Sequence, residues 1–155
     1  MTLVSISVCV RNGVDWIDGC MESLVNQTHS PLEIILVDDG SSDGGEQKVE
    51  AWSKHALVTV ITQGTLGLSA GRMAALEASR GEWFAITDID VRPEADWIQR
   101  MLESSDSGEG EEVVAVTGRT IFGRADDVIS RIRSIEIESK YRSRPRRTNL
   151  ANGPC

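Results

Sequence analysis

Four aspartates stand in two short clusters whose spacing suits the binding of a cation or a phosphate group. The first cluster is Asp38 and Asp39, and the second is Asp88 and Asp90, which have one residue between them. On an extended backbone this second spacing points both carboxylates to the same side. Carboxylates at one place repel each other unless hydrogen-bond donors or a cation balance their charge. A hard divalent ion that also binds phosphate oxygens would provide that balance.

The first cluster, in Asp38-Asp39-Gly40-Ser41, is also typical of an ordinary turn with helix-capping residues, and a lone D-x-D such as the second often occurs by chance. The combination is more specific, because each cluster directly follows an apolar segment that reads as a strand. Between them lies a third polar segment, Gly67-Leu68-Ser69-Ala70-Gly71-Arg72, at the start of a predicted helix. The set as a whole therefore favours a binding site.

The segments around these clusters alternate between strand and helix patterns. Apolar runs predict strands at 3–10, 33–37, 57–61, 83–87 and 113–117. Helical spacing predicts helices at 16–27, 45–55, 69–79, about 93–103 and 126–141, with a polar loop at 104–112. This alternation predicts an α/β fold of the Rossmann-like, three-layer α/β/α type with a mainly parallel sheet. Ligands bind such sheets outside the carboxyl ends of the strands, where both aspartate clusters are expected.

Composition and charge narrow the class of protein. The 155 residues fit one domain, and the three cysteines lack the spacing of a disulfide framework or a metal site. No run approaches the roughly 20 apolar residues of a membrane span, and no basic region precedes the apolar start, so we expect a cytoplasmic protein. The net charge is −8, with +5 at 131–147 and −13 elsewhere. An acidic body argues against nucleic acid as a partner.

In this order the motifs resemble those of glycosyltransferase family 2, a family of inverting enzymes with the GT-A fold. The resemblance covers essentially the whole chain. Ser23-Leu24-Val25-Asn26-Gln27-Thr28 resembles the family's S-L-x-x-Q-T, and 33–43 is close to E-I-I-V-V-D-D-G-S-T-D. The segments 4–8, 67–72 and 78–83 are similar to V-S-V-I-I, G-L-S-A-A-R and A-x-x-G-E-Y.

The resemblance implies a site for a nucleotide-sugar donor. Asp39 would accept a hydrogen bond from the base, which suits the imide N–H of uracil, and Arg72 would reach the base or the phosphates. Val10, Arg11 and Asn12 would also line the nucleotide site, although the family usually has P-T-Y-N where this chain has Cys9-Val10-Arg11-Asn12. A guanidinium can stack on a base in place of the aromatic ring. The preference for one base therefore stays open.

The resemblance also implies a divalent metal, Mn²⁺ or Mg²⁺. Asp88 would lie near the ribose and the metal, and Asp90 would be a metal ligand. Breaking the sugar–phosphate bond leaves a nucleoside diphosphate, whose negative charge a divalent ion stabilises.

The general base of the transfer reaction cannot be named. An inverting transfer needs a base for the acceptor hydroxyl. In the family this residue follows a segment like 149–155, where the chain ends. We therefore expect residues 1–155 to be a single, truncated GT-A domain that binds the donor but transfers the sugar poorly or not at all.

Other functions and partners follow from the same features. A non-catalytic nucleotide-sugar-binding module is the main alternative, and a nucleotidyltransferase fits less well, because Arg11-Asn12-Gly13-Val14-Asp15 lacks a basic, glycine-rich signature.

The acceptor would be a glycan, a lipid-linked sugar or a polysaccharide. The basic stretch 141–148 is interpreted as a mobile loop, with closure over the diphosphate and contact with anionic lipid at the cytoplasmic face of a membrane as alternatives. A homodimer is a further expectation.

Overall fold

The computed structural model of the chain describes residues 1–106, 113–121 and 128–142. By its internal contacts the chain divides into two units, residues 1–100 and 101–155. The sheet and every predicted site residue lie in the first unit. A single domain over the whole chain stays a prediction.

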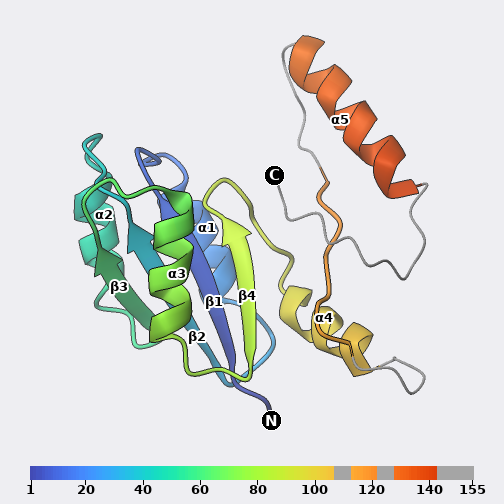
Figure 1. Ribbon diagram of the computed structural model, residues 1–155, viewed down its shortest axis with the longest axis horizontal. Helices are drawn as coiled ribbons and strands as arrows, with labels where there is room; N and C mark the ends of the chain where they lie inside the picture. Colours follow the sequence, from blue (N-terminus) through green and yellow to red (C-terminus); the bar gives the residue numbers. More distant parts are fainter. Residues whose placement is uncertain (107–112, 122–127, 143–155) are drawn as a thin grey trace. The chain divides into compact units, whose positions relative to one another are not determined.

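The first unit is built on a four-stranded parallel sheet (Figure 1). The strands are β1 (Val4–Val10), β2 (Leu32–Asp38), β3 (Val58–Thr62) and β4 (Trp83–Asp88). Their order is β3-β2-β1-β4, and all three neighbouring pairs are parallel. The four strands predicted between residues 3 and 87 are thereby confirmed.

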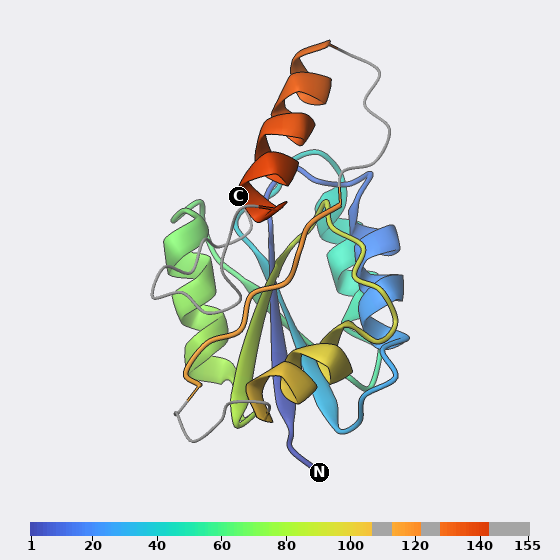
Figure 2. The same ribbon diagram turned by 90° about the vertical axis from the view of Figure 1, so that its right-hand side faces the viewer.

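Three helices cover the two faces of this sheet. Helices α1 (Ile17–Val25) and α2 (Gly45–Trp52) lie on one face, and α3 (Leu68–Ala78) lies on the other (Figure 2). The three-layer α/β/α arrangement is therefore confirmed. All seven residues of β2 are buried, as expected for a strand covered on both faces.

The start of α4 (Trp97–Asp106) differs from the prediction, which began this helix near residue 93. The side chain of Gln27, at the end of α1, explains the difference. Its amide nitrogen donates to the carbonyl of Glu94 at 2.8 Å, and its oxygen accepts the backbone N–H of Ile98 at 3.1 Å. The backbone before Trp97 is thus bound to α1, and the helix begins where an acceptor satisfies one of its first N–H groups.

Two sequence predictions concern the second unit, a long helix and a strand, and the structure shows only the helix among the described residues. Helix α5 (Val128–Arg142) confirms the helix predicted at 126–141. No strand is assigned in 113–121, so the strand predicted at 113–117 is wrong for the described structure. The physical reason is that a strand is defined by pairing, which an apolar run does not provide by itself.

Three further expectations concern the loop at 104–112, the end of the chain from residue 141, and membrane-spanning helices. Residues 104–106 belong to α4, so the polar loop predicted at 104–112 begins later than expected, and its remainder lies outside the described residues. Residues 141–142 end α5, while 143–148 of the basic stretch and the segment 149–155 are also outside them. In the described ranges, no helix has the length and apolar character needed to cross a bilayer.

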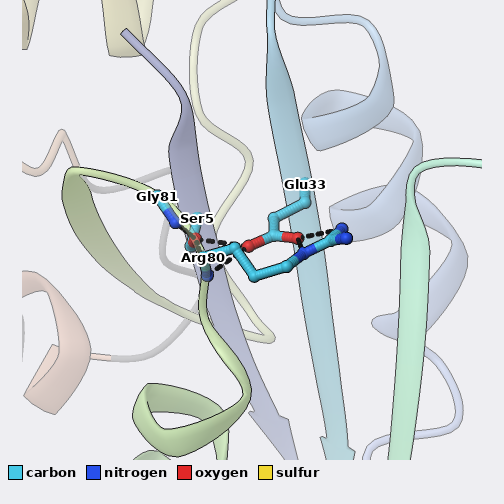
Figure 3. A network of polar contacts seen from close by, with 4 residues as sticks. All are labelled: Ser5, Glu33, Arg80 and Gly81. Carbon is cyan, nitrogen blue, oxygen red and sulfur yellow. Dashed lines mark hydrogen bonds and ion pairs between the residues drawn. The ribbon is translucent and has the colours of Figure 1, made fainter.

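A network of polar contacts ties the amino ends of β1 and β2 to the turn between α3 and β4 (Figure 3). The hydroxyl of Ser5 donates to Glu33 Oε1 at 2.6 Å and accepts the N–H of Gly81 at 2.8 Å. Arg80 donates to Glu33 through its backbone N–H at 2.7 Å and through its guanidinium at 2.8 and 2.6 Å. The network lies at the amino end of the sheet, opposite the end that carries the predicted site.

Gly81→Ala is expected to destabilise the fold by about 1–3 kcal/mol, because overpacking shifts backbone. A Cβ at position 81 would lie 2.6 Å from the backbone nitrogen of Ser5 and 2.8 Å from the carbonyl oxygen of Leu3. The matched control is Gly64→Ala, since a Cβ there meets no heavy atom within 4 Å. Denaturant unfolding should leave this control within about 0.5 kcal/mol of wild type. Equal stability of the two variants would contradict the prediction.

Candidate functional site

The sheet register brings the two aspartate clusters to one edge. Asp38 pairs with Val10 and Asp88 pairs with Cys9, at the carboxyl ends of the strands on either side of β1. The first aspartates of the two clusters therefore lie within one residue of the same level along β1. This confirms the sequence-based expectation that parallel strands would place them at a common edge.

Asp39 is a buried carboxylate held by a set of hydrogen-bond donors. It is 4% exposed. Its Oδ1 accepts from the side-chain amide of Gln63 and the backbone N–H of Leu66, both at 2.7 Å, and its Oδ2 accepts the N–H of Gly67 at 2.9 Å. The bond from Gln63, those backbone bonds and the charge of Arg11 outweigh burial, so the pKa of Asp39 lies below its usual value. Asp39 is thus a fixed anion beside β1.

Gln63 is a site residue that sequence reasoning missed. It directly follows β3 and joins the loop 63–67 to Asp39 through its amide. Its backbone N–H also donates to the carbonyl of Asp38 at 2.9 Å, which extends the strand pairing by one residue. The only signal in the sequence was its position after a strand end, which the motif reading did not use.

The residues after β1 are largely engaged by the turn that follows β2. The carbonyl of Val10 accepts the N–H of Asp39 at 2.9 Å, and the Val10 side chain is buried. Asn12 has a left-handed φ of 53°, and its Oδ1 accepts the N–H of Ser42 at 2.9 Å. Arg11 is exposed between them. Of the three predicted residues, Val10 is buried, whereas Arg11 and Asn12 are exposed.

Asp38 has a local structural role beside these residues. Its Oδ1 accepts the N–H of Ser41 at 3.0 Å, and the residue is 3% exposed. The carboxylate therefore stabilises the turn after β2, as the ordinary turn interpretation of this cluster implies.

Arg72 and Asp88 form an ion pair across the edge of the sheet. Arg72 Nη2 lies 2.9 Å from Asp88 Oδ1, with side-chain exposures of 33% and 25%. Helix α3 comes close enough for this pairing because residue 71 is glycine: a Cβ there would lie 3.1 Å from Cys9 Sγ on β1. The structure therefore brings together two predicted site residues that are 16 positions apart in the sequence.

Asp90 is the exposed member of the second cluster. Within the described ranges, its carboxylate makes no hydrogen bond and no ion pair. Its oxygens are the ligands that Mg²⁺ and Mn²⁺ prefer, so the chemistry of the donor set fits the implied metal. The described residues contain no group of three or more histidines, cysteines or acids that could hold a metal by itself.

Comparison with known proteins shows the family. Residues 5–154 match the profile of glycosyl transferase family 2. The putative glycosyltransferase EpsH of Bacillus subtilis is 41% identical over 103 residues, which are 66% of this chain and 30% of EpsH. The chain thus spans less than a third of that relative.

Two solved structures are similar in fold. The mannosyltransferase PcManGT from Pyrobaculum calidifontis, in complex with GDP-Man and Mn²⁺, has a TM-score of 0.60 and 26% identity, covering 64% of this chain and 31% of PcManGT. TarS 1–349 of S. aureus, in complex with UDP-GlcNAc, has a TM-score of 0.61 and 21% identity, covering 80% of this chain and 39% of TarS 1–349. Profile, relative and fold agree, and the chain belongs to glycosyl transferase family 2.

Proposed function

We propose that this chain forms the donor-binding part of a glycosyltransferase that uses a nucleoside-diphosphate sugar and a divalent metal. The observation that carries the proposal is that a buried anion and an exposed one, Asp39 and Asp90, follow strands that end at the same side of the sheet. A buried carboxylate suits recognition of a base, whereas an exposed one suits a hydrated metal ion and its phosphate ligands.

Asp39 would select the base. Its Oδ1 already accepts from Gln63 and Leu66, and its Oδ2 accepts from Gly67, so Oδ2 has more capacity for a further donor. The ring N–H of uracil or guanine is such a donor. The UDP-GlcNAc complex of TarS and the GDP-Man complex of PcManGT support these two classes, and we propose a UDP-sugar as the donor. The exposed guanidinium of Arg11 would lie against the base.

Asp90 and Asp88 would hold the metal side of the donor. Asp90 would be a direct ligand of Mn²⁺ or Mg²⁺, and the oxygens of the diphosphate would complete the coordination. When bound, the metal would supply Lewis-acid stabilisation to the departing diphosphate. Arg72 would keep the Asp88 carboxylate in place, since the two side chains are already paired at 2.9 Å. As the bond between the sugar and the diphosphate breaks, the acceptor hydroxyl oxygen would bond to the same sugar carbon from the opposite side, which inverts it, and the hydroxyl proton would pass to a general base.

The acceptor and the cellular location are part of the same proposal. We propose a glycan, a lipid-linked sugar or a polysaccharide as the acceptor, and a cytoplasmic location with peripheral membrane contact through 141–148. None of the described residues is assigned as the general base. A chain that binds the donor without transferring sugar would act as a nucleotide-sugar-binding module instead.

The test is calorimetric titration of UDP and UDP-sugars with and without Mn²⁺. For wild type we expect Mn²⁺ to tighten binding about ten-fold or more, as a coupling between two ligands that contact each other allows. Asp90→Ala should remove this gain. The control is Glu77→Ala, which removes an exposed carboxylate from α3. If the affinity for UDP changed neither with Mn²⁺ nor in Asp90→Ala, the assignment of the metal would be overturned. If no nucleotide bound at all, the donor site would be overturned.

A further inference from the structure

Asp90 lies in a turn, residues 88–92, that is attached to the rest of the unit on both sides. On the strand side, the carbonyl of Asp88 accepts the N–H of Val91 at 3.1 Å and the thiol of Cys20 at 3.7 Å. The side chain of Ile89 lies against Gly13, where a Cβ would be 3.5 Å from Ile89 Cγ2. These contacts hold the beginning of the turn to α1 and to the segment between β1 and α1.

The other side of the turn is held by Arg92. Its Cζ lies 5.7 Å from the centroid of the Trp16 ring, within the range of a cation–π contact. Its guanidinium also lies directly over Gly19 of α1, because a Cβ at position 19 would be 2.4 Å from Nη2, 2.6 Å from Nε and 2.8 Å from Cζ. The guanidinium can therefore take this place only because residue 19 has no side chain.

The presence of glycine at position 19 has no backbone explanation. Gly19 lies inside α1, and it is not among the residues with positive φ. Glycine is unfavourable inside a helix compared with alanine. The space that it leaves for Arg92 is the physical reason that the structure offers for it.

We infer that Arg92 is a positioning residue: its guanidinium, which lies over Gly19 and beside the Trp16 ring, holds the turn that presents Asp90. This inference rests on the proposed function, because Asp90 is the proposed metal ligand. Arg92 does not touch the metal or the donor in this assignment. It limits the motion of the turn before the ligands arrive, so that the Asp90 carboxylate does not have to be ordered on binding.

Three variants separate positioning from other roles. Arg92→Ala removes the guanidinium, and Trp16→Leu removes the ring that it lies on. Gly19→Ala keeps both Arg92 and its charge but places a methyl group where the guanidinium lies, and it raises the helix propensity of α1. The control is Arg100→Ala, which removes a basic side chain from α4 outside the turn.

The first measurement needs neither metal nor nucleotide. Hydrogen exchange of the Val91 amide, which donates to Asp88, should become about ten-fold faster in Arg92→Ala and Gly19→Ala, as local opening of a released turn predicts. In Arg100→Ala the Val91 amide should exchange as fast as in wild type. The melting temperature of Gly19→Ala should not be lower than that of wild type. Unchanged exchange in both turn variants would overturn the inference, whatever the donor proves to be.

The second measurement is the ratio of UDP affinities with and without Mn²⁺. We expect this ratio to fall about ten-fold in the three variants, while metal-free UDP binding at the Asp39 side stays unchanged, since only the metal-linked part depends on the turn. Trp16→Phe, which keeps an aromatic ring at this position, should retain most of the Mn²⁺ effect that Trp16→Leu loses. If Arg92→Ala weakened UDP equally in both conditions and Gly19→Ala did not, Arg92 would be a direct phosphate ligand and the inference would be wrong. A wild type without any Mn²⁺ effect would instead contradict the proposed function.

Discussion

Glu33→Ala is expected to lower the free energy of unfolding by about 1–3 kcal/mol, the cost of leaving buried hydrogen-bond donors without their acceptor. The Glu33 side chain is 8% exposed and accepts from the Ser5 hydroxyl, the Arg80 backbone N–H and the Arg80 guanidinium. Alanine leaves these donors without their acceptor at the amino edge of the sheet. Denaturant unfolding followed by tryptophan fluorescence measures the loss.

The control for this prediction is Arg80→Ala. The Arg80 side chain is 76% exposed, so its guanidinium returns to water with little loss, and its backbone N–H still donates to Glu33. We expect a loss of no more than about 1 kcal/mol for this variant. If both variants lost the same amount, the stabilisation would come from the surface ion pair and not from the buried carboxylate.

The same network gives the unfolding free energy a pH dependence of known sign. Burial by itself would raise the pKa of Glu33, but the hydrogen bonds from Ser5 and Arg80 outweigh burial and lower the pKa from its ordinary value of 4.5. Glu33 therefore stabilises the fold fully above the unfolded pKa and loses this effect as pH falls through the folded pKa. The stability difference between wild type and Glu33→Gln should shrink as the pH is lowered below 4.5. A constant difference would contradict the lowered pKa.

Asp39→Asn is expected to weaken the binding of UDP on the order of 100-fold, because a buried charged hydrogen-bond partner is lost. Asparagine keeps the size of the side chain but removes the charge that Gln63, Leu66 and Gly67 now surround with donors. Its NH₂ group would also face one of those donors or the ring N–H of the base. Titration of UDP and of CDP is the measurement, and we expect the preference of wild type for UDP to disappear.

The matched control for Asp39→Asn is Asp43→Asn at the same edge of the sheet. Asp43 also accepts two backbone N–H groups, from Val14 and Gly45, each at 2.9 Å, but it is exposed and has no proposed contact with the base. UDP affinity should therefore stay within a few-fold of wild type in this variant. Equal weakening in both variants would mean that the base is read elsewhere, with Arg11 as the next residue to substitute.

The sequence by itself determined the four strands, their helices and the edge where the acidic clusters meet. The reason is that such patterns are local: the near-continuous apolar run at 33–37 predicts a strand covered on both faces, and β2 spans Leu32–Asp38 with every residue buried. Parallel strands joined by helices then bring all their carboxyl ends to one side, so Asp39 and Asp88 had to lie at the same side of the sheet. The family motifs added the expected roles of these residues, which spacing alone left open between a turn and a site.

Only the tertiary structure decided which partners hold the site residues. Gln63 donates to Asp39 across 24 positions, and Arg80 donates to Glu33 across 47, and neither pair has a local signature. The place of Arg92 over Gly19 likewise depends on how the turn after β4 packs on α1. The strand predicted at 113–117 was wrong for the same reason, since a strand needs a partner that the apolar pattern does not specify. Local pattern determined the elements, and contacts between distant segments determined the charge, order and exposure of the groups that would do the chemistry.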